Sequence, residues 1–164
     1  MRTSHQAKAL LAAALTCLLL SGCTSGDASI SAQVEALLKA RPATHIDLAQ
    51  IGPASWERIC VLKPYTTNAH AEQVLGFAWD AERNTSIAGN EGINVLVFTQ
   101  GREVAAYTEH PRSKGDFSRM QPSCLPRTRA IVIREQMSNG WVFLVSSQLA
   151  HHKSTASDSS NLAR

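Results

Sequence analysis

The sequence lacks the short motifs that mark several common catalytic and metal sites. It contains no Gly-x-Ser-x-Gly elbow, no His-Glu-x-x-His pattern and no Ser-x-x-Lys motif. Neither Cys-x-x-Cys spacing nor a phosphate-binding glycine-rich loop occurs. The sequence therefore predicts no cofactor and no metal ion, and the scattered acid or base candidates define no catalytic set: His45, His70, His110, Asp47, Asp80 and Asp116.

The chain also lacks a hydrophobic run long enough to cross a membrane. Its longest predominantly apolar stretch, residues 9–20, is shorter than the ~20 residues of a membrane-spanning helix. Arg2 and Lys8 precede this stretch, and small residues follow it. That order of basic, apolar and small residues is typical of an export signal, so residues 1–22 are predicted to be a signal peptide.

The four residues Leu20, Ser21, Gly22 and Cys23 resemble the lipobox of bacterial lipoproteins. The resemblance implies cleavage before Cys23, attachment of a diacylglycerol to its thiol and acylation of the new amine. Two or three acyl chains hold a protein stably on a membrane, because each buried methylene contributes ~0.8 kcal/mol. Thr24 follows where an Asp would signal retention at the inner membrane, so the resemblance favours the outer membrane, facing the periplasm. A secretory signal that happens to contain a cysteine is the alternative.

An excess of positive charge is missing from the predicted mature chain. Removal of residues 1–22 takes away Arg2 and Lys8, which leaves 14 basic against 13 acidic side chains. This balance argues against a nucleic-acid partner. The remaining chain suits one domain, predicted at residues 30–147, with a lipidated tether at 23–29 and a disordered polar tail at 148–164.

Only two cysteines remain after processing. Cys17 leaves with the signal peptide and Cys23 carries the lipid, so Cys60 and Cys124 are left in an oxidising compartment. A structural disulfide is the simplest expectation for such a pair. A catalytic thiol and a pair of metal thiolates are the alternatives.

The mature chain begins with a helical pattern and continues with strands. Hydrophobic residues at helical spacing predict a helix over residues 30–40, capped by Ser31. Strands are predicted over 45–51 and 56–63, a short helix over 69–75 ended by Gly76, and a loop over 77–92 containing a core anchor, Trp79. Trp56, Cys60 and Leu62 are assigned to one face of the second strand, with a ligand-stacking Trp56 as the alternative to a buried one.

Two hairpins are predicted in the second half of the domain. Residues 93–98 and 103–109 flank a turn at Gln100 and Gly101, and residues 130–135 and 141–145 flank Asn139 and Gly140. The Asn-Gly pair predicts a type I′ turn. The expected fold is α+β: a small antiparallel sheet built from the two hairpins and one or two N-terminal strands, with one or two short helices.

Between the hairpins lies a basic loop, residues 110–129. Its residues Arg112, Lys114, Arg119 and Arg127 are candidates for an anion-binding site, because guanidinium and ammonium groups match phosphate and carboxylate groups. A solvated loop held by Cys124 is the alternative. Asn84-Thr85-Ser86 and the His151-His152 pair are given no functional role.

The domain resembles small proteobacterial lipoproteins in which a Trp and a Cys share one strand. Here Trp56, Cys60, Pro64, Tyr65 and the downstream Cys124 carry that resemblance, which implies no particular activity. The sequence therefore predicts a non-catalytic envelope lipoprotein that binds an envelope protein or an anionic polymer. A membrane-tethered periplasmic hydrolase is the alternative.

Overall fold

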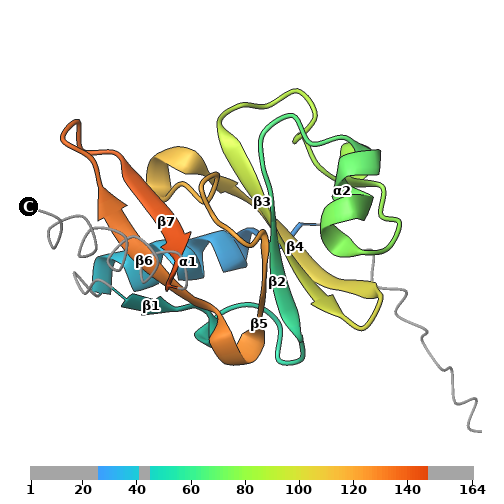
Figure 1. Cartoon of the computed structure of the whole chain (residues 1–164), viewed down its shortest axis with the longest axis horizontal. Helices are drawn as coiled ribbons and strands as arrows, with labels where there is room; N and C mark the ends of the chain where they lie inside the picture. The colour runs from blue at the N-terminus through green and yellow to red at the C-terminus, as the bar shows by residue number, and fades with distance from the viewer. Residues whose placement is uncertain (1–25, 41–44, 148–164) are drawn as a thin grey trace, which may run out of the picture.

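The computed structural model describes residues 26–40 and 45–147. In these residues helices combine with two antiparallel sheets, which confirms the predicted α+β class (Figure 1). The elements in chain order are α1 (Ala28–Ala40), β1 (His45–Asp47), η1 (Leu48–Gln50), β2 (Arg58–Leu62), α2 (Asn68–Leu75), α3 (Ala81–Asn84), β3 (Ile93–Gln100), β4 (Glu103–Pro111), η2 (Arg112–Lys114), β5 (Cys124–Pro126), η3 (Arg127–Arg129), β6 (Ile131–Gln136) and β7 (Val142–Ser146).

The two predicted hairpins exist, but they lie in different sheets. The hairpin β3–β4 belongs to a four-stranded sheet of order β4-β3-β2-β5, whereas β6–β7 joins β1 in a three-stranded sheet. Figure 1 shows the smaller sheet to the left of the larger one and α2 to its right. The expectation of a single sheet is therefore wrong, because β2 and β5 extend one hairpin and β1 extends the other.

Each face of the four-stranded sheet is covered by its own hydrophobic core. On β2, Ile59 and Val61 pack with α1 and the smaller sheet, while Cys60 and Leu62 pack with α2 and α3. Strand β3 is buried over seven consecutive residues, as its near-continuous hydrophobic run predicts. Two layers of cover thus fix the position of the central strands.

Trp56 departs from the predicted alternation. It precedes β2 and belongs to the core on the α1 side, not to the face of Cys60. Its ring packs edge-on against Phe98 with centroids 5.2 Å apart, and its Nε1 donates to the carbonyl of Ile51. Because only 3% of its surface is exposed, Trp56 is a core residue and not a ligand platform.

Helix α1 begins two residues earlier than predicted, and Ser31 is not its cap. Asp27 accepts hydrogen bonds from the backbone N–H groups of Ser29, through its side chain, and of Ile30, through its carbonyl. Asp27 also donates its own N–H to the carbonyl of Tyr107 at 2.8 Å. Residues 26–29 therefore belong to the domain, and the predicted tether is correspondingly shorter.

The turn of the second hairpin also differs from the prediction. Gly140 has a positive φ of 83°, but Asn139 does not share it, so the turn is not type I′. The Gly140 N–H donates to the carbonyl of Met137, and Met137 N–H donates to the carbonyl of Trp141. This is the three-residue arrangement in which a type I turn is followed by a left-handed glycine.

The helical prediction for residues 69–75 is confirmed by α2, which ends at Gly76 in the left-handed conformation. The predicted loop at 77–92 contains the short helix α3, capped by the Asp80 side chain. The expected strand at 45–51 is shorter than predicted and continues as η1, where Asp47 accepts from the Ala49 N–H.

The predicted disulfide is confirmed. Cys60 and Cys124 face each other across β2 and β5, with their Cα atoms 4.0 Å apart. The bond therefore joins the basic segment between the hairpins to a central strand. The predicted signal peptide, the lipidation site Cys23 and the polar tail 148–164 lie outside the described residues.

Candidate functional site

The four candidate anion-binding cations do not converge. Arg112 pairs with Asp116, and Lys114 donates to Glu35 Oε1 at 2.8 Å. These two cations lie on η2, yet each is engaged with a different carboxylate. Because each cation is already paired with a carboxylate, their positions do not favour an anion-binding site. Anion binding by Arg112 and Lys114 stays a prediction.

The other two cations lie against aromatic rings. The Arg119 guanidinium carbon is 3.7 Å from the centroid of Phe143, and that of Arg127 is 5.0 Å from the centroid of Trp56. Arg127 also donates to the carbonyls of Ala54 and Ala49. A cation–π contact gives Arg119 a structural role, and Arg127 combines such a contact with its backbone hydrogen bonds.

Asp116 is the centre of a buried polar cluster in the same segment. Its carboxylate accepts from Arg112 Nη2 at 2.9 Å, Arg112 Nε at 3.0 Å, Trp141 Nε1 at 3.1 Å and the Ser118 N–H at 2.8 Å. Burial alone would raise the pKa of Asp116, but the hydrogen bonds from Arg112, Ser118 and Trp141 outweigh it and lower the pKa below its ordinary value. The carboxylate is thus held in its charged form.

Gly115 allows this cluster to form. Its φ of 139° disfavours other residues, and a Cβ there would lie 2.8 Å from Leu38 Cδ1 and 3.1 Å from Leu144 Cδ1. The close approach lets Asp116 pair with β7 through the Val142 carbonyl and the Leu144 N–H. A glycine in the basic segment therefore has a packing role.

The pair that comes nearest to a nucleophile and its base is Ser31 and His110. The Ser31 hydroxyl lies 2.9 Å from His110 Nδ1. His110 is fully buried, however, and Ser31 is 7% exposed. A substrate cannot reach these atoms in this conformation, so the pair links α1 to β4 instead of forming an accessible catalytic site.

The stability of the protein is expected to depend on pH through His110. Burial lowers the pKa of His110 to about 4, against a smaller opposing effect of Glu35. The unfolded chain takes up the proton near pH 6.5, so the free energy of unfolding should fall as the pH drops from about 6.5 to about 4. With up to ~1.4 kcal/mol per pH unit, the total loss is about 3 kcal/mol.

Urea denaturation at half-unit pH steps measures this dependence. His110→Gln should flatten it between pH 6.5 and 4, whereas His70→Gln, at an exposed position on α2, should leave it in place. An equal slope in the wild type and in His110→Gln would contradict the assignment to His110.

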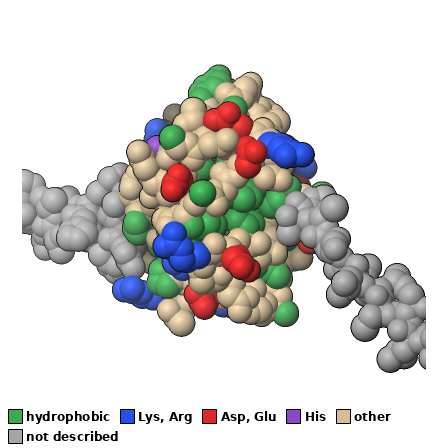
Figure 2. Space-filling view, turned by 90° about the vertical axis from the view of Figure 1, so that its right-hand side faces the viewer, with side chains coloured by type: hydrophobic (Ala, Val, Ile, Leu, Met, Phe, Trp, Pro, Cys, Tyr) green, Lys and Arg blue, Asp and Glu red, His purple; other side chains and the backbone are tan. Residues whose placement is uncertain are grey.

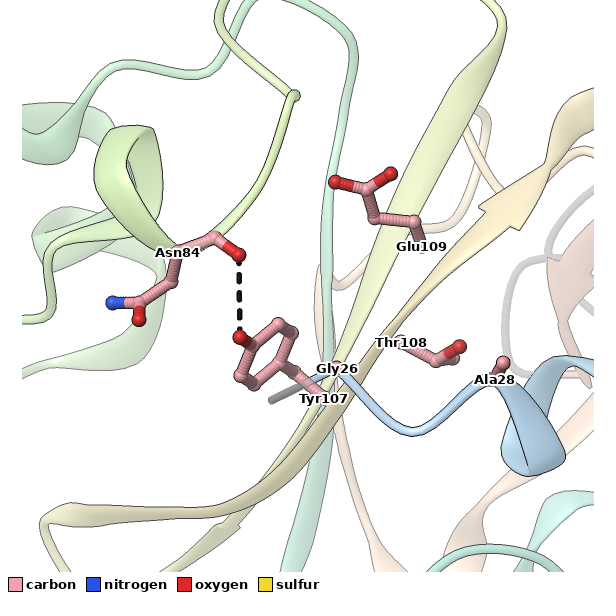
Figure 3. A pocket seen from close by; sticks show the side chains of 6 residues that line it. All are labelled: Gly26, Ala28, Asn84, Tyr107, Thr108 and Glu109. Carbon is pink, nitrogen blue, oxygen red and sulfur yellow. Dashed lines mark hydrogen bonds between the residues drawn. The ribbon is translucent and has the colours of Figure 1, made fainter. Parts of the chain in front are cut away.

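Two hollows flank α3 on the face of the molecule that carries α2. The first has a volume of about 410 Å³ and is lined by Gly26, Ala28, Asn84, Tyr107, Thr108 and Glu109 (Figure 3). The second has a volume of about 510 Å³ and is lined by Asn68, Ala69, Glu72, Ala78, Trp79 and Asp80. Figure 2 shows an apolar depression on this face with acidic and basic side chains around it. Both hollows are concave surfaces that a ligand can reach.

An aromatic pair separates the two hollows. The rings of Trp79 and Tyr107 meet edge to face with centroids 5.1 Å apart. The Tyr107 hydroxyl donates to the carbonyl of Asn84, as Figure 3 shows. Trp79 is half-buried at the edge of the core on the α2 side. Trp79 therefore packs against the core, as predicted, and it also lines the second hollow.

Tyr65, one of the residues that carry the resemblance, is an exposed aromatic residue in an unusual conformation. Its φ is 63°, a left-handed conformation that is uncommon for a bulky residue, and 58% of its surface is exposed. Its hydroxyl donates to Glu91 Oε2 at 3.3 Å. The Pro64–Tyr65 dipeptide indicates a strand end but not this conformation.

No family model, no curated protein and no solved structure matches the chain. Across residues 26–40 and 45–147, no helix is both long enough and apolar enough to span a membrane. In that same part of the chain, no three His, Cys, Asp or Glu side chains are grouped to hold a metal ion.

Proposed function

We propose that the chain is a cell-envelope lipoprotein, anchored through Cys23 at the outer membrane and facing the periplasm, that binds a partner protein or an envelope polymer. The observation that carries the proposal is the start of the folded domain. The lipobox cysteine lies three residues before Gly26, and the next residue, Asp27, is fastened to β4 by its hydrogen bond to Tyr107. A domain that begins so soon after Cys23 suits cleavage at that residue.

The confirmed disulfide gives independent support for export. Disulfides persist in oxidising compartments such as the periplasm and are rare in the cytosol. Cys60 is fully buried beside α2 and Cys124 is half-buried against the same core, so the bond is packed into the fold.

Binding, as opposed to catalysis, is the activity that the described side chains favour. The Asp116 cluster is satisfied by internal partners, and the Ser31–His110 pair is buried. The hollows beside Trp79, by contrast, are open to a partner. The proposed activity is therefore recognition by a surface that the lipid keeps close to a membrane.

Replacing the lipobox cysteine tests the proposal. Cys23→Ala should abolish labelling by palmitate and leave the chain as an unprocessed precursor or release it from the membrane fraction, because no acylated thiol remains. Cys17→Ala, which changes the other cysteine near the N-terminus, is the matched control and should be processed normally. Normal processing and membrane partition of Cys23→Ala would overturn the proposed anchor.

A further inference from the structure

We propose that the hollow at Trp79 binds a basic segment of a partner protein, with a lysine or arginine side chain lying against the indole. The inference deepens the proposed function, on which it rests, by naming the chemistry of the partner. Its basis is the lining of the two hollows that flank α3.

The charged residues that line these hollows are all acidic. Glu72 and Asp80 line the second hollow, and Glu109 lines the first, while neither lining contains a lysine or an arginine. In the described part of the chain, the Glu72 carboxylate makes no hydrogen bond or ion pair with a neighbour. A cation that enters the second hollow therefore meets a carboxylate that is not already neutralised.

Trp79 supplies the second element of recognition. An ammonium or guanidinium group near an indole face is attracted by the ring quadrupole, and the aliphatic stem of the side chain can pack on apolar neighbours. Ala69 and Ala78 provide those neighbours in the same hollow. The combination of an aromatic ring, small apolar residues and free carboxylate fits a long cationic side chain better than an anion.

The site is held in place before any partner binds. Tyr107 packs against Trp79, and the Asp80 carboxylate accepts from Asn68 Nδ2 and from the Arg83 N–H. Asn68 and Glu82 exchange hydrogen bonds of 2.8 and 3.0 Å, which join α2 to α3. Little ordering is then required on association, and this lowers the cost of binding.

A peptide segment is favoured over a single amine because acidic lining continues across α3. Glu109 lies in the neighbouring hollow, where Figure 3 shows it beside Tyr107. Figure 2 shows acidic side chains on more than one side of the apolar depression, with basic side chains also on its rim. An extended segment whose cations reach Glu72 and Glu109 complements these carboxylates over its length.

Titration of the exported chain with pentalysine tests the proposal. Pentalysine should shift the NMR signal of the Trp79 indole N–H, and the affinity should fall at least fivefold between low ionic strength and 0.5 M salt, at about which the Debye length is only a few ångströms. Pentalysine acetylated on every Nζ should not produce the shift, because it has lost the side-chain charges.

Two variants separate the hollow from general electrostatic attraction. Glu72→Gln should weaken pentalysine binding about fivefold, and Trp79→Leu should weaken it by tenfold or more. Glu135→Gln removes a carboxylate from β6 and should leave the affinity unchanged. Since Glu72 is exposed on α2, its substitution should not alter the melting temperature, and this keeps the test valid even if Trp79→Leu unfolds.

Several results would overturn the inference. These are no shift with pentalysine at low salt, an equal response to acetylated pentalysine, or equal weakening by Glu72→Gln and Glu135→Gln. A shift of the Trp79 signal with an N-acetylglucosamine oligomer but not with pentalysine would assign the hollow to a polysaccharide instead. Failure of the proposed anchor appears separately, in the processing of Cys23→Ala, and does not affect this titration.

Discussion

Reduction of the Cys60–Cys124 disulfide is expected to lower the free energy of unfolding by about 4 kcal/mol. The two cysteines are 64 residues apart in the chain, and closing a loop of that length reduces the entropy of the unfolded state by this amount in the chain-entropy model. The folded state also depends on the bond, because β5 is a three-residue edge strand that pairs only with β2.

Guanidinium denaturation of oxidised and reduced protein measures the loss. Cys60→Ala with Cys124→Ala should reproduce the reduced midpoint approximately, and a reducing agent should have no further effect on that double variant. Two thiols that titrate freely in native protein, or an unchanged midpoint after complete reduction, would contradict the structural role of the bond.

Replacement of Asp116 by alanine is expected to lower the free energy of unfolding by about 3 to 5 kcal/mol. The substitution leaves Arg112, whose side chain is only 21% exposed, without its main counter-charge. It also leaves Trp141 Nε1 and the Ser118 N–H without their acceptor. Removing one partner of a largely buried ion pair is costly because the other charge remains desolvated.

Glu91→Gln provides the matched control for Asp116→Ala. Glu91 lies 4.0 Å from the same guanidinium, but its side chain is 73% exposed, whereas that of Asp116 is 0% exposed. Exposed ion pairs contribute little, so the control should change stability by less than about 1 kcal/mol. Thermal and urea denaturation of the two variants would contradict the role of Asp116 if their losses were equal.

The local elements were predictable because their signals are local. The Gly76 stop of α2, the hydrophobic run of β3 and the two hairpins follow from periodicity and turn residues in short windows of the sequence. The separation of the hairpins into two sheets was not predictable in this way. It depends on whether β1 pairs with β6 or with β2, and strand pairing between distant segments has no local signal.

The candidate site was less accessible from the sequence than the fold. The sequence suggested one site because four cations lie close together in the chain: Arg112, Lys114, Arg119 and Arg127. In the structure each of them has a separate internal partner. Conversely, Glu72 and Trp79 line one hollow, beside the hydrogen bonds between Asn68 and Glu82 that join α2 to α3. Charge and aromatic content identify residues that can bind, but tertiary contacts decide which of them meet.

The attachment of the N-terminal segment determines how the domain bears a mechanical load. A pull on the chain at Gly26 is first resisted by the hydrogen bond from the Asp27 N–H to the Tyr107 carbonyl. This single bond can break while the strand pairing of β4 stays intact. The force then reaches α1, whose buried residues Ile30, Val34 and Leu38 are wedged between the sheets. If the chain is anchored through Cys23 as proposed, a pull on the anchor would lengthen the free segment by a few residues before it strained the core.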